Sequence, residues 1–223
     1  MHLALIMDGN GRWAKQHLKA RIFGHKEGAK KIREITEFCA KSNIEYLSLY
    51  AFSTENWKRP KAEVEYLMKL LGEYLIKERQ TYLQSNIIFK SIGDISKLSL
   101  ELQQEIKSLE EQTQAQCNGL TQILALNYGA KDELRRAFLK LNQKENFEIE
   151  EEGIAKMLDT SGIPDVDMLV RTGGEMRLSN FLLWQSAYAE LFFTQTLWPN
   201  FSTQELESMI IEFHQRNRRF GGL

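Results

Sequence analysis

A short polar stretch near the N-terminus has the residue types of an anion-binding loop. It reads IMDGNGRWAK over residues 6–15, where an apolar run ends in an acid and continues through two glycines and an arginine: Asp8, Gly9, Gly11 and Arg12. Glycine lets backbone N–H groups approach an anion closely, and the N-terminus of a following helix adds positive potential. Arginine offers a planar fork of donors that suits phosphate oxygens. The stretch therefore predicts a loop that holds phosphate.

The aspartate at the start of this loop needs an explanation, because its carboxylate would repel a bound phosphate. Mg²⁺ between the two would remove the conflict, since this ion commonly binds one or two carboxylates together with substrate phosphates. The alternative is structural: Asp8 would cap the next helix or close a tight turn, in which Asp–Gly pairs are common. The polar clusters farther along the chain favour metal binding or acid–base chemistry for Asp8.

Polar clusters follow three further apolar runs. They are Ser53, Thr54, Glu55, Asn56, Trp57, Lys58 and Arg59 after the second run, Asn127, Tyr128 and Gly129 after another, and Arg171 to Glu175 with Arg177, Leu178, Ser179 and Asn180 after the last. In open α/β sheets, ligands bind beyond the carboxyl ends of the strands. Arginine recurs in three of the four clusters, which predicts a polyanionic ligand such as a diphosphate.

Several of these side chains also have a purely structural interpretation. Trp13 could belong to the core, and Trp57 could fill a loop. His25 could form hydrogen bonds where a helix starts. Two arginines, Arg171 and Arg177, could pair with the nearby acids Glu175 and Glu190.

The elements that must position the clusters alternate between strands and helices. We expect strands over residues 3–7, 46–52, 87–92, 121–126, 168–171 and 190–193, and helices over 24–41, 62–84, 98–114, 132–141, 150–159 and 203–219. Such alternation needs crossover connections, which favours a mostly parallel sheet of about six strands with helices on both faces. We expect one α/β domain over residues 1–223.

Composition excludes several classes of protein. The 223 residues carry a net charge of −1, so no global field favours nucleic acid, although one site needs only a few cations. The chain has no apolar run of the ~20 residues that a membrane span needs and no signal-peptide pattern. Cys39 and Cys117 are isolated, and no histidine has zinc-ligand spacing. We therefore expect a soluble cytoplasmic protein without a nucleic-acid partner.

Missing motifs narrow the ligand further. GxxxxGK[ST] is absent, which excludes a P-loop NTPase, and Gly9-Asn10-Gly11 lacks the third glycine of a dinucleotide-binding loop. No two aspartates are adjacent, so the aspartate-rich metal motif of the all-helical trans-prenyltransferases is absent as well.

Seven stretches resemble the cis-prenyltransferase family, in order and across essentially the whole chain. They are MDGNGRWA, GHKEGAK, LYAFSTENWKRP, NYGAKDE, DMLVRTGGEMRLSNFLLWQSAYAELFF, LWPNF and RRFGG. The resemblance implies an enzyme that adds isopentenyl diphosphate in cis to farnesyl diphosphate and makes undecaprenyl diphosphate, a carrier for bacterial cell-wall precursors. It also implies Mg²⁺, a homodimer, and an apolar tunnel lined by the second and third helices and the sheet.

The resemblance assigns roles to the allylic half of the site. Asp8 matches the aspartate that binds Mg²⁺ and assists the chemistry. The residues that match contacts to the allylic diphosphate are Gly9, Asn10, Gly11, Arg12, Arg21 and His25, and we also expect Trp13 to bind substrate. The residues that match a segment closing over both substrates are Ser53, Thr54, Glu55, Asn56, Trp57, Arg59 and Glu63. Within that segment, Asn56 is a catalytic candidate because it could relay a proton together with Ser53 and Asp8.

The remaining matches concern the second substrate and the partner subunit. Arg171, Arg177 and Ser179 match the isopentenyl diphosphate site. Glu190 matches a glutamate that reaches the metal, in the family often from the neighbouring subunit. Arg219 lies in a C-terminal RxG element that can reach the partner's active site.

Three other functions remain open at this point. One is a cis-polyprenyl diphosphate synthase with a shorter or longer product, because the tunnel segment over residues 121–126 leaves the chain length open. A phosphatase with Asp8 as nucleophile would usually carry a second acid two residues on, where Asn10 stands. A non-catalytic partner subunit would not need Asp8, Asn56, Arg171 and Arg177 together. We also expect transient, peripheral contact with the membrane, because the product is a lipid.

Overall fold

The computed structural model describes residues 1–143 and 150–216, and its centre is one parallel sheet of six strands. The strand order is β3-β4-β2-β1-β5-β6. The strands are β1 (His2–Ile6), β2 (Tyr46–Ser53), β3 (Ile88–Ile92), β4 (Thr121–Tyr128), β5 (Met168–Arg171) and β6 (Glu190–Phe193). Every neighbouring pair is parallel, so all carboxyl ends lie at the same edge.

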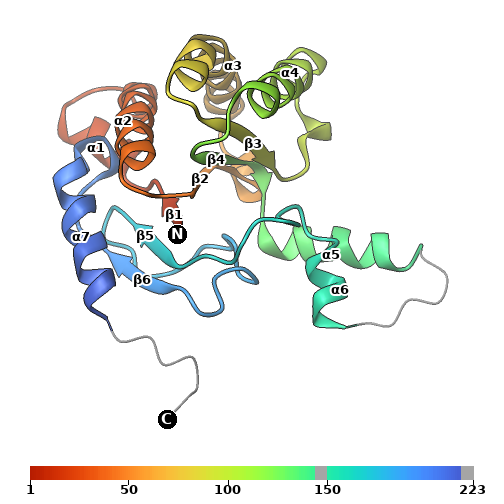
Figure 1. Ribbon diagram of the computed structural model, residues 1–223. Coiled ribbons are helices and arrows are strands. Elements are labelled where there is room, and N and C mark those ends of the chain that lie inside the picture. The colour runs from red at the N-terminus through yellow and green to blue at the C-terminus, as the bar shows by residue number, and fades with distance from the viewer. Residues whose placement is uncertain (144–149, 217–223) are drawn as a thin grey trace.

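Helices cover both faces of this sheet. They are α1 (Asn10–Gln16), α2 (Arg21–Lys41), α3 (Lys61–Gln84), α4 (Leu100–Gln116), α5 (Ala130–Leu141), α6 (Glu151–Ala155) and α7 (Thr203–Gln215), with short 3₁₀ turns η1 (Thr54–Lys58), η2 (Ile95–Lys97) and η3 (Trp198–Asn200). Figure 1 shows α2, α3 and α4 together above the sheet, with α5 and α6 on the opposite side. The predicted fold class, a parallel α/β sheet flanked by helices, is confirmed.

Alternation along the strands explains why both faces are covered. In β1, Leu3 and Leu5 belong to a core shared with α2, α3, α4 and α7, whereas Ala4 and Ile6 face a second core that includes residues of α5 and the 181–182 loop. A central strand buried on both faces reads as a continuous apolar run, which is the pattern that predicted it.

No helix in the described ranges is long and apolar enough to span a membrane.

Several predicted boundaries were wrong: α4 spans Leu100–Gln116 rather than 98–114, and α5 begins at Ala130 rather than 132. Helix α2 begins at Arg21 rather than 24, and the short helix α1 before it was not predicted as an element. Strand β4 continues to Tyr128. The helix expected over 150–159 ends at Ala155, and the chain then turns so that the Asp159 backbone N–H donates to Glu133 in α5 at 2.9 Å. Helix α7 ends at Gln215, and residues 217–219 of that prediction lie outside the described residues.

The connectivity makes one position at the sheet edge special. From the central strand β1 the chain moves to β2 on one side, and it later returns to β5 on the other side of β1. The carboxyl ends of β1 and β5 therefore flank a topological switch point, which is where ligands bind in open α/β sheets.

Candidate active site

Asp8 and Arg171 meet across this switch point. Asp8 follows β1, and its Oδ2 accepts a hydrogen bond from Arg171 Nη2 at 3.0 Å. Arg12 Nη2 lies 3.3 Å from the same oxygen, and the backbone N–H of Gly9 donates to Oδ1 at 2.6 Å. The Asp8 side chain is 32% exposed, whereas that of Arg171 is 5% exposed. The carboxylate is therefore fixed by two cations and still open to a ligand.

Two glycines next to Asp8 occupy positions that a side chain would not fit, Gly9 in the chain itself and Gly173 in the loop after β5. Gly9 has φ +110°, a left-handed conformation that side chains rarely adopt, and α1 starts from it. Gly173 has φ +85°, and a Cβ there would lie 2.6 Å from Arg12 Nη2. The Asp8 carbonyl accepts from Thr172 Oγ1 at 2.8 Å. These contacts hold the ends of β1 and β5 close together.

Arg171 also organises the loop that follows β5. Its Nη1 donates to Ser179 Oγ and to the Arg177 carbonyl, both at 2.6 Å. Its Nε is buried and has no hydrogen-bond partner among the described residues. Arg177 itself is 61% exposed and pairs with Glu175, as the structural interpretation expected. Arg171 pairs with Asp8 instead of an acid of its own loop.

The same loop contains backbone strain that other elements must hold. Ser179, Asn180 and Leu182 have φ of 49°, 64° and 44°, a left-handed region that is costly for side chains other than glycine. Asn180 ties the loop to α5, because its carbonyl accepts from Ala130 N–H at 2.8 Å and its Oδ1 from Lys131 N–H at 3.0 Å. Its Nδ2 donates to Glu55 Oε1 at 3.0 Å.

The role of Asn180 was not predicted. The sequence places this residue in a polar cluster, but Lys131, at the N-terminus of α5 that it caps, lies 49 positions away. A sequence signal does exist: the preceding Gly129 has no side chain with which to cap α5.

Glu63, in the first turn of α3, contacts three basic side chains. Its Oε1 lies 3.0 Å from Arg21 Nε, 2.9 Å from Arg59 Nη1 and 3.3 Å from His25 Nε2. Burial lowers the pKa of His25, although its hydrogen bond to Glu63 acts in the opposite direction. Arg21 also reaches residues 9–12, which we call the glycine loop, since a Cβ at Gly11 would lie 3.0 Å from Arg21 Nε.

The turn after β2 presents the residues predicted to close over the substrates. The Ser53 backbone N–H donates to Asn56 Oδ1 at 3.2 Å, and the Ser53 side chain caps the turn in return. Trp57 Nε1 donates to Asn127 Oδ1 at 2.7 Å, which anchors η1 to the end of β4. Thr54 packs against Gly129, because a Cβ built on Gly129 would lie 2.7 Å from the Thr54 hydroxyl oxygen.

A cavity of about 650 Å³ connects these groups to an apolar interior. Its polar lining includes Asp8, Asn10, His25, Ser53, Glu55, Asn56, Arg59, Arg171, Arg177 and Ser179. Its apolar lining includes Ala29 and Ile32 of α2, Leu67, Met68 and Leu71 of α3, and Ala51, Leu124 and Leu126 of the sheet. Ten predicted site residues thus line one cavity that continues between α2, α3 and the sheet.

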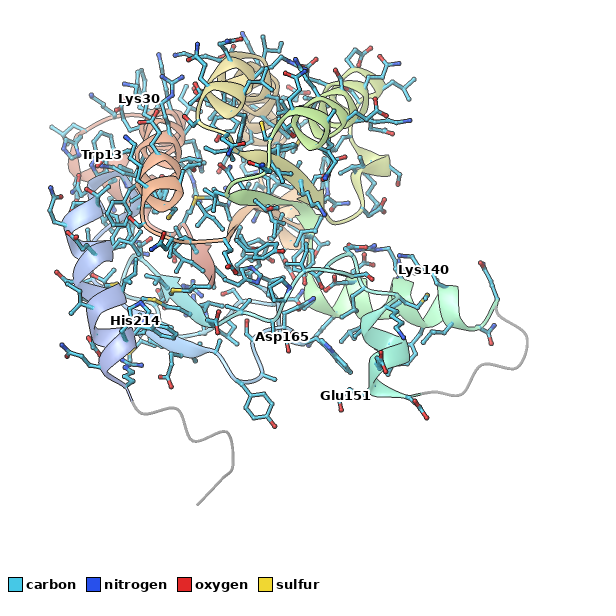
Figure 2. All side chains as sticks on the ribbon, viewed as in Figure 1. Trp13, Lys30, Lys140, Glu151, Asp165 and His214 are labelled. Atoms are coloured by element: carbon cyan, nitrogen blue, oxygen red, sulfur yellow. The ribbon has the colours of Figure 1, made fainter. Side chains whose placement is uncertain are left out.

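The other predicted site residues do not line this cavity. Arg12 contacts the lining residue Asp8, Glu63 contacts His25 and Arg59, and Trp57 packs against Phe52. Gly9, Gly11 and Thr54 are chain neighbours of lining residues, and Arg21 contacts Glu63. Trp13 lies on the outer side of α1, where Figure 2 labels it, and its Nε1 donates to Asn200 Oδ1 at 2.8 Å.

Glu190 and Arg219 stand apart from the cavity of this chain. Glu190 begins β6, level with Met168 and therefore at the sheet edge opposite to Asp8. Its Oε2 accepts from Arg216 Nη1 at 2.7 Å. Within one chain the two predicted metal ligands are not brought together. Arg219, with the rest of the RxG element, lies outside the described residues.

The donor set at Asp8 fits a metal that arrives with a diphosphate. The described residues contain no group of three or more His, Cys, Asp or Glu side chains that could cage an ion. Asp8 offers one partly exposed carboxylate, and Asn10 Oδ1 is a buried oxygen in the same cavity without a hydrogen-bond partner among the described residues. Mg²⁺ characteristically uses one or two protein oxygens, substrate phosphates and water.

Comparisons with known proteins place the chain in a family. Residues 6–221 match the prenyltransferase family model described as "Putative undecaprenyl diphosphate synthase". An isoprenyl transferase of Wolinella succinogenes is 60% identical over 222 residues, covering 100% of this chain and 96% of the relative. An isoprenyl transferase of Helicobacter pylori is 57% identical and covers 100% of this chain and 97% of the relative.

Two solved structures have the same fold along the whole chain. The probable undecaprenyl diphosphate synthase of Campylobacter jejuni has a TM-score of 0.84 at 40% identity, covering 99% of this chain and 97% of that one. The lavandulyl diphosphate synthase of Lavandula x intermedia, solved with dimethylallyl diphosphate, has a TM-score of 0.93 at 32% identity, with coverage of 99% and 97%. The chain therefore belongs to the cis-prenyltransferase family that its motifs resemble, and it is an enzyme of that family.

Proposed function

We propose that this enzyme condenses isopentenyl diphosphate units in cis onto farnesyl diphosphate and releases undecaprenyl diphosphate. One observation carries the proposal: a single cavity has a polar mouth with Asp8, Arg171 and Arg177, and an apolar interior between α2, α3 and the sheet. Such a cavity suits substrates that have a diphosphate head and a hydrocarbon tail. The relatives named as isoprenyl transferases support the transfer of isoprenyl units.

The arginines divide into two sets that suit two diphosphates. The first set, Arg12 of α1 and Arg21 of α2, lies at the glycine loop, and we assign it to the allylic diphosphate together with His25. The second set, Arg171 and Arg177, lies on the loop after β5, and we assign it to isopentenyl diphosphate together with Ser179. Holding both substrates in one cavity converts a bimolecular step into an intramolecular one.

Carbon–carbon bond formation needs charge stabilisation at the mouth of the cavity. The double bond of isopentenyl diphosphate supplies the electron pair for the new bond to the allylic carbon, and the allylic diphosphate leaves with its own pair. Mg²⁺ held by Asp8 and the phosphates would stabilise the negative charge on that leaving group. Arg12 and the N–H groups at the start of α1 would stabilise the same charge.

A proton must then leave carbon two of the added unit. Ser53, Asn56 and Asp8 are the polar groups of the cavity that we propose to relay it to a carboxylate or diphosphate oxygen. The backbone N–H of Ser53 donates to Asn56 Oδ1, which holds the Asn56 side chain in place. We propose that Asn56 touches the substrate and that Ser53 positions the Asn56 side chain.

The proposal includes the assembly and the setting of the enzyme. We propose a homodimer in which the partner's copies of Glu190 and Arg219 approach this site. We also propose that the enzyme works at the cytoplasmic side of the membrane and touches it peripherally, because a polyprenyl product has low solubility in water.

A direct assay tests the proposed reaction. The purified chain is incubated with farnesyl diphosphate, radiolabelled isopentenyl diphosphate and Mg²⁺, and the extracted lipid is sized by chromatography. We expect label in a long-chain polyprenyl diphosphate, with little label when Mg²⁺ is chelated. An absence of labelled lipid would support a non-catalytic subunit, and phosphate release from simple phosphate monoesters would support a phosphatase.

A further inference from the structure

Basic residues are concentrated in one segment of this nearly neutral chain. Residues 12–33 contain eight Lys or Arg and one Asp or Glu, whereas the complete chain has a net charge of −1. The rest of the chain must therefore carry eight more acids than bases. The segment forms α1, the loop after it and the first half of α2. Five of these eight bases pair with carboxylates, and the other three, Lys15, Lys19 and Lys26, can attract an anionic surface that the nearly neutral molecule as a whole would not.

The loop between α1 and α2 also exposes apolar side chains. Leu18 is 97% exposed and Phe23 is 46% exposed. Leu18 has φ 54°, a left-handed conformation that is costly for leucine and that asparagine or glycine adopts more readily. Because Leu18 buries almost nothing in the folded chain, neither packing nor backbone preference explains a leucine here. A strained residue that adds nothing to the stability of the fold points to a role in binding.

Three lysines of the same segment have no carboxylate partner among the described residues. Lys15, Lys19 and Lys26 form no ion pair with any carboxylate of residues 1–143 and 150–216. The Lys19 amine lies 5.9 Å from the ring centroids of both Trp13 and Phe23. Such cation–π contacts support the loop and keep the amine at the level of the aromatic rings.

We call the set Lys15, Leu18, Lys19, Phe23 and Lys26 the α1–α2 corner. It lies at the outer edge of the molecule, at the upper left of Figure 1, and Trp13 and Lys30 mark the same region in Figure 2. It borders the active site, because Arg12 belongs to α1 and a Cβ at Gly11 would lie 3.0 Å from Arg21 Nε.

We propose that the α1–α2 corner docks on a bilayer that contains anionic phospholipid. Exposed leucine and aromatic side chains enter the interface between headgroups and acyl chains, while the lysines contact the headgroups. The inference rests on the proposed function in one respect, since a lipid product gives the enzyme a reason to dock beside its own active site. Nucleic acid would use the lysines but would gain little from an apolar residue at the tip of the loop.

Sedimentation with vesicles tests the docking without any substrate. The chain is mixed with vesicles of phosphatidylglycerol and phosphatidylethanolamine, and separately with vesicles of phosphatidylcholine. We expect binding to the anionic vesicles only. Lys15→Gln/Lys19→Gln/Lys26→Gln should weaken binding by about a hundredfold, at about fivefold for each charge.

The variant Leu18→Asn separates docking from folding. Asparagine tolerates the left-handed backbone, so the unfolding midpoint should stay the same or rise, while binding to anionic vesicles falls by about tenfold. The matched control for Leu18 is Ile76→Gln, because Ile76 is an apolar residue of α3 that is 65% exposed. The matched control for the lysines is Lys61→Gln/Lys69→Gln/Lys107→Gln, which removes the same charge elsewhere. Neither control should change binding by more than about twofold.

Three results would overturn the docking proposal. They are absence of binding to anionic vesicles, equal binding to phosphatidylcholine, and equal losses in the corner variants and the controls. Binding of duplex DNA instead of vesicles would assign the corner to nucleic acid. Synthesis of polyprenyl diphosphate in detergent solution should be unchanged in all corner variants, so failure of that synthesis in the unaltered chain would contradict the proposed function and not the docking surface.

Discussion

At the scale of single residues, Asp8 joins two otherwise separate sets of cations. Its Oδ2 contacts both Arg12, on the glycine loop, and Arg171, at the end of β5. The pair with Arg12 is exposed and adds little stability, whereas the pair with Arg171 satisfies a buried guanidinium group. The carboxylate is nevertheless partly open and lies at the switch point of the sheet, so we propose that Asp8 takes part in the chemistry as well as holding Arg171 in place.

Asp8→Ala should reduce turnover strongly and leave substrate binding largely intact. Loss of a group that stabilises charge only in the transition state lowers kcat by about a hundredfold to a thousandfold. The dissociation constant of farnesyl diphosphate should change by less than about threefold, because the glycine loop and Arg21 remain. Calorimetry and steady-state kinetics measure the two quantities. Asp8→Asn is the conservative control, and a variant that lost binding but kept its turnover would contradict the metal role.

Arg177→Ala should affect the two substrates unequally. Removing a charge-assisted contact to a diphosphate should raise KM for isopentenyl diphosphate by about tenfold or more. KM for farnesyl diphosphate should change by less than about twofold, since its proposed site lies on the other side of Asp8. Arg135→Ala is a matched control, because Arg135 is 60% exposed and pairs with a nearby acid in the same way. Equal increases for both substrates would contradict the assignment of two sites.

At the scale of elements, close packing of α1 against α2 fixes the glycine loop. A Cβ at Gly24 would lie 1.9 Å from the Asn10 carbonyl oxygen, and one at Gly28 would lie 2.2 Å from Asn10 Oδ1. Glycine in a helix interior is normally unfavourable, yet α2 contains both. Helix α2 therefore accepts a weaker local preference so that the start of α1 can approach it.

Gly24→Ala should destabilise the enzyme, against the usual effect of this substitution in a helix. Alanine alone would favour the helix by about 1 kcal/mol, but the clash with Asn10 should cost about 1–3 kcal/mol more than that gain. Gly72→Ala in α3 is the matched control, because its Cβ would meet only the end of the flexible Leu102 side chain at 3.2 Å. Urea unfolding should therefore move in opposite directions for the two variants. Stabilisation by both would show that the contact with Asn10 does not constrain the loop.

Much of this element structure could be predicted from the sequence, and the reason is physical. The strands are apolar runs buried on both faces, and ligands collect at their carboxyl ends, so the pattern of residues alone predicts Asp8 and Arg171 at one edge of the sheet. Helix α1 was missed because seven residues are too few for a helical period, and its N-cap Gly9 has no side chain. The tether from Asn180 to α5 was missed because it joins distant segments.

At the scale of the whole molecule, the sheet and two helices enclose one cavity that begins at the charged mouth. Its apolar walls come from α2, α3, β2 and β4, and the lining residue Ala51 is the smallest side chain on the β2 wall. If the cavity holds the growing chain, its depth limits the length of the product. Chain length is therefore a property of the assembled fold rather than of any motif.

Ala51→Phe should shorten the product without stopping the first additions. The larger ring would fill space that a long hydrocarbon needs, whereas short intermediates near the mouth would still fit. Chromatography of the labelled lipid should show shorter chains, with the rate of the first condensation within about threefold of the unaltered enzyme. Ala115→Phe, at an exposed position of α4, is the control. Products of unchanged length would show that the chain does not grow through this cavity.

A crystal structure with both substrates bound would test the account most directly. The chain would be crystallised with Mg²⁺, isopentenyl diphosphate and an unreactive analogue of farnesyl diphosphate. We expect the allylic diphosphate on the Gly9–Arg12 loop, with Mg²⁺ between it and Asp8, and the second diphosphate on Arg171, Arg177 and Ser179. The farnesyl tail should enter the space between α2 and α3. Both diphosphates on one set of arginines, or a tail outside that space, would contradict the account.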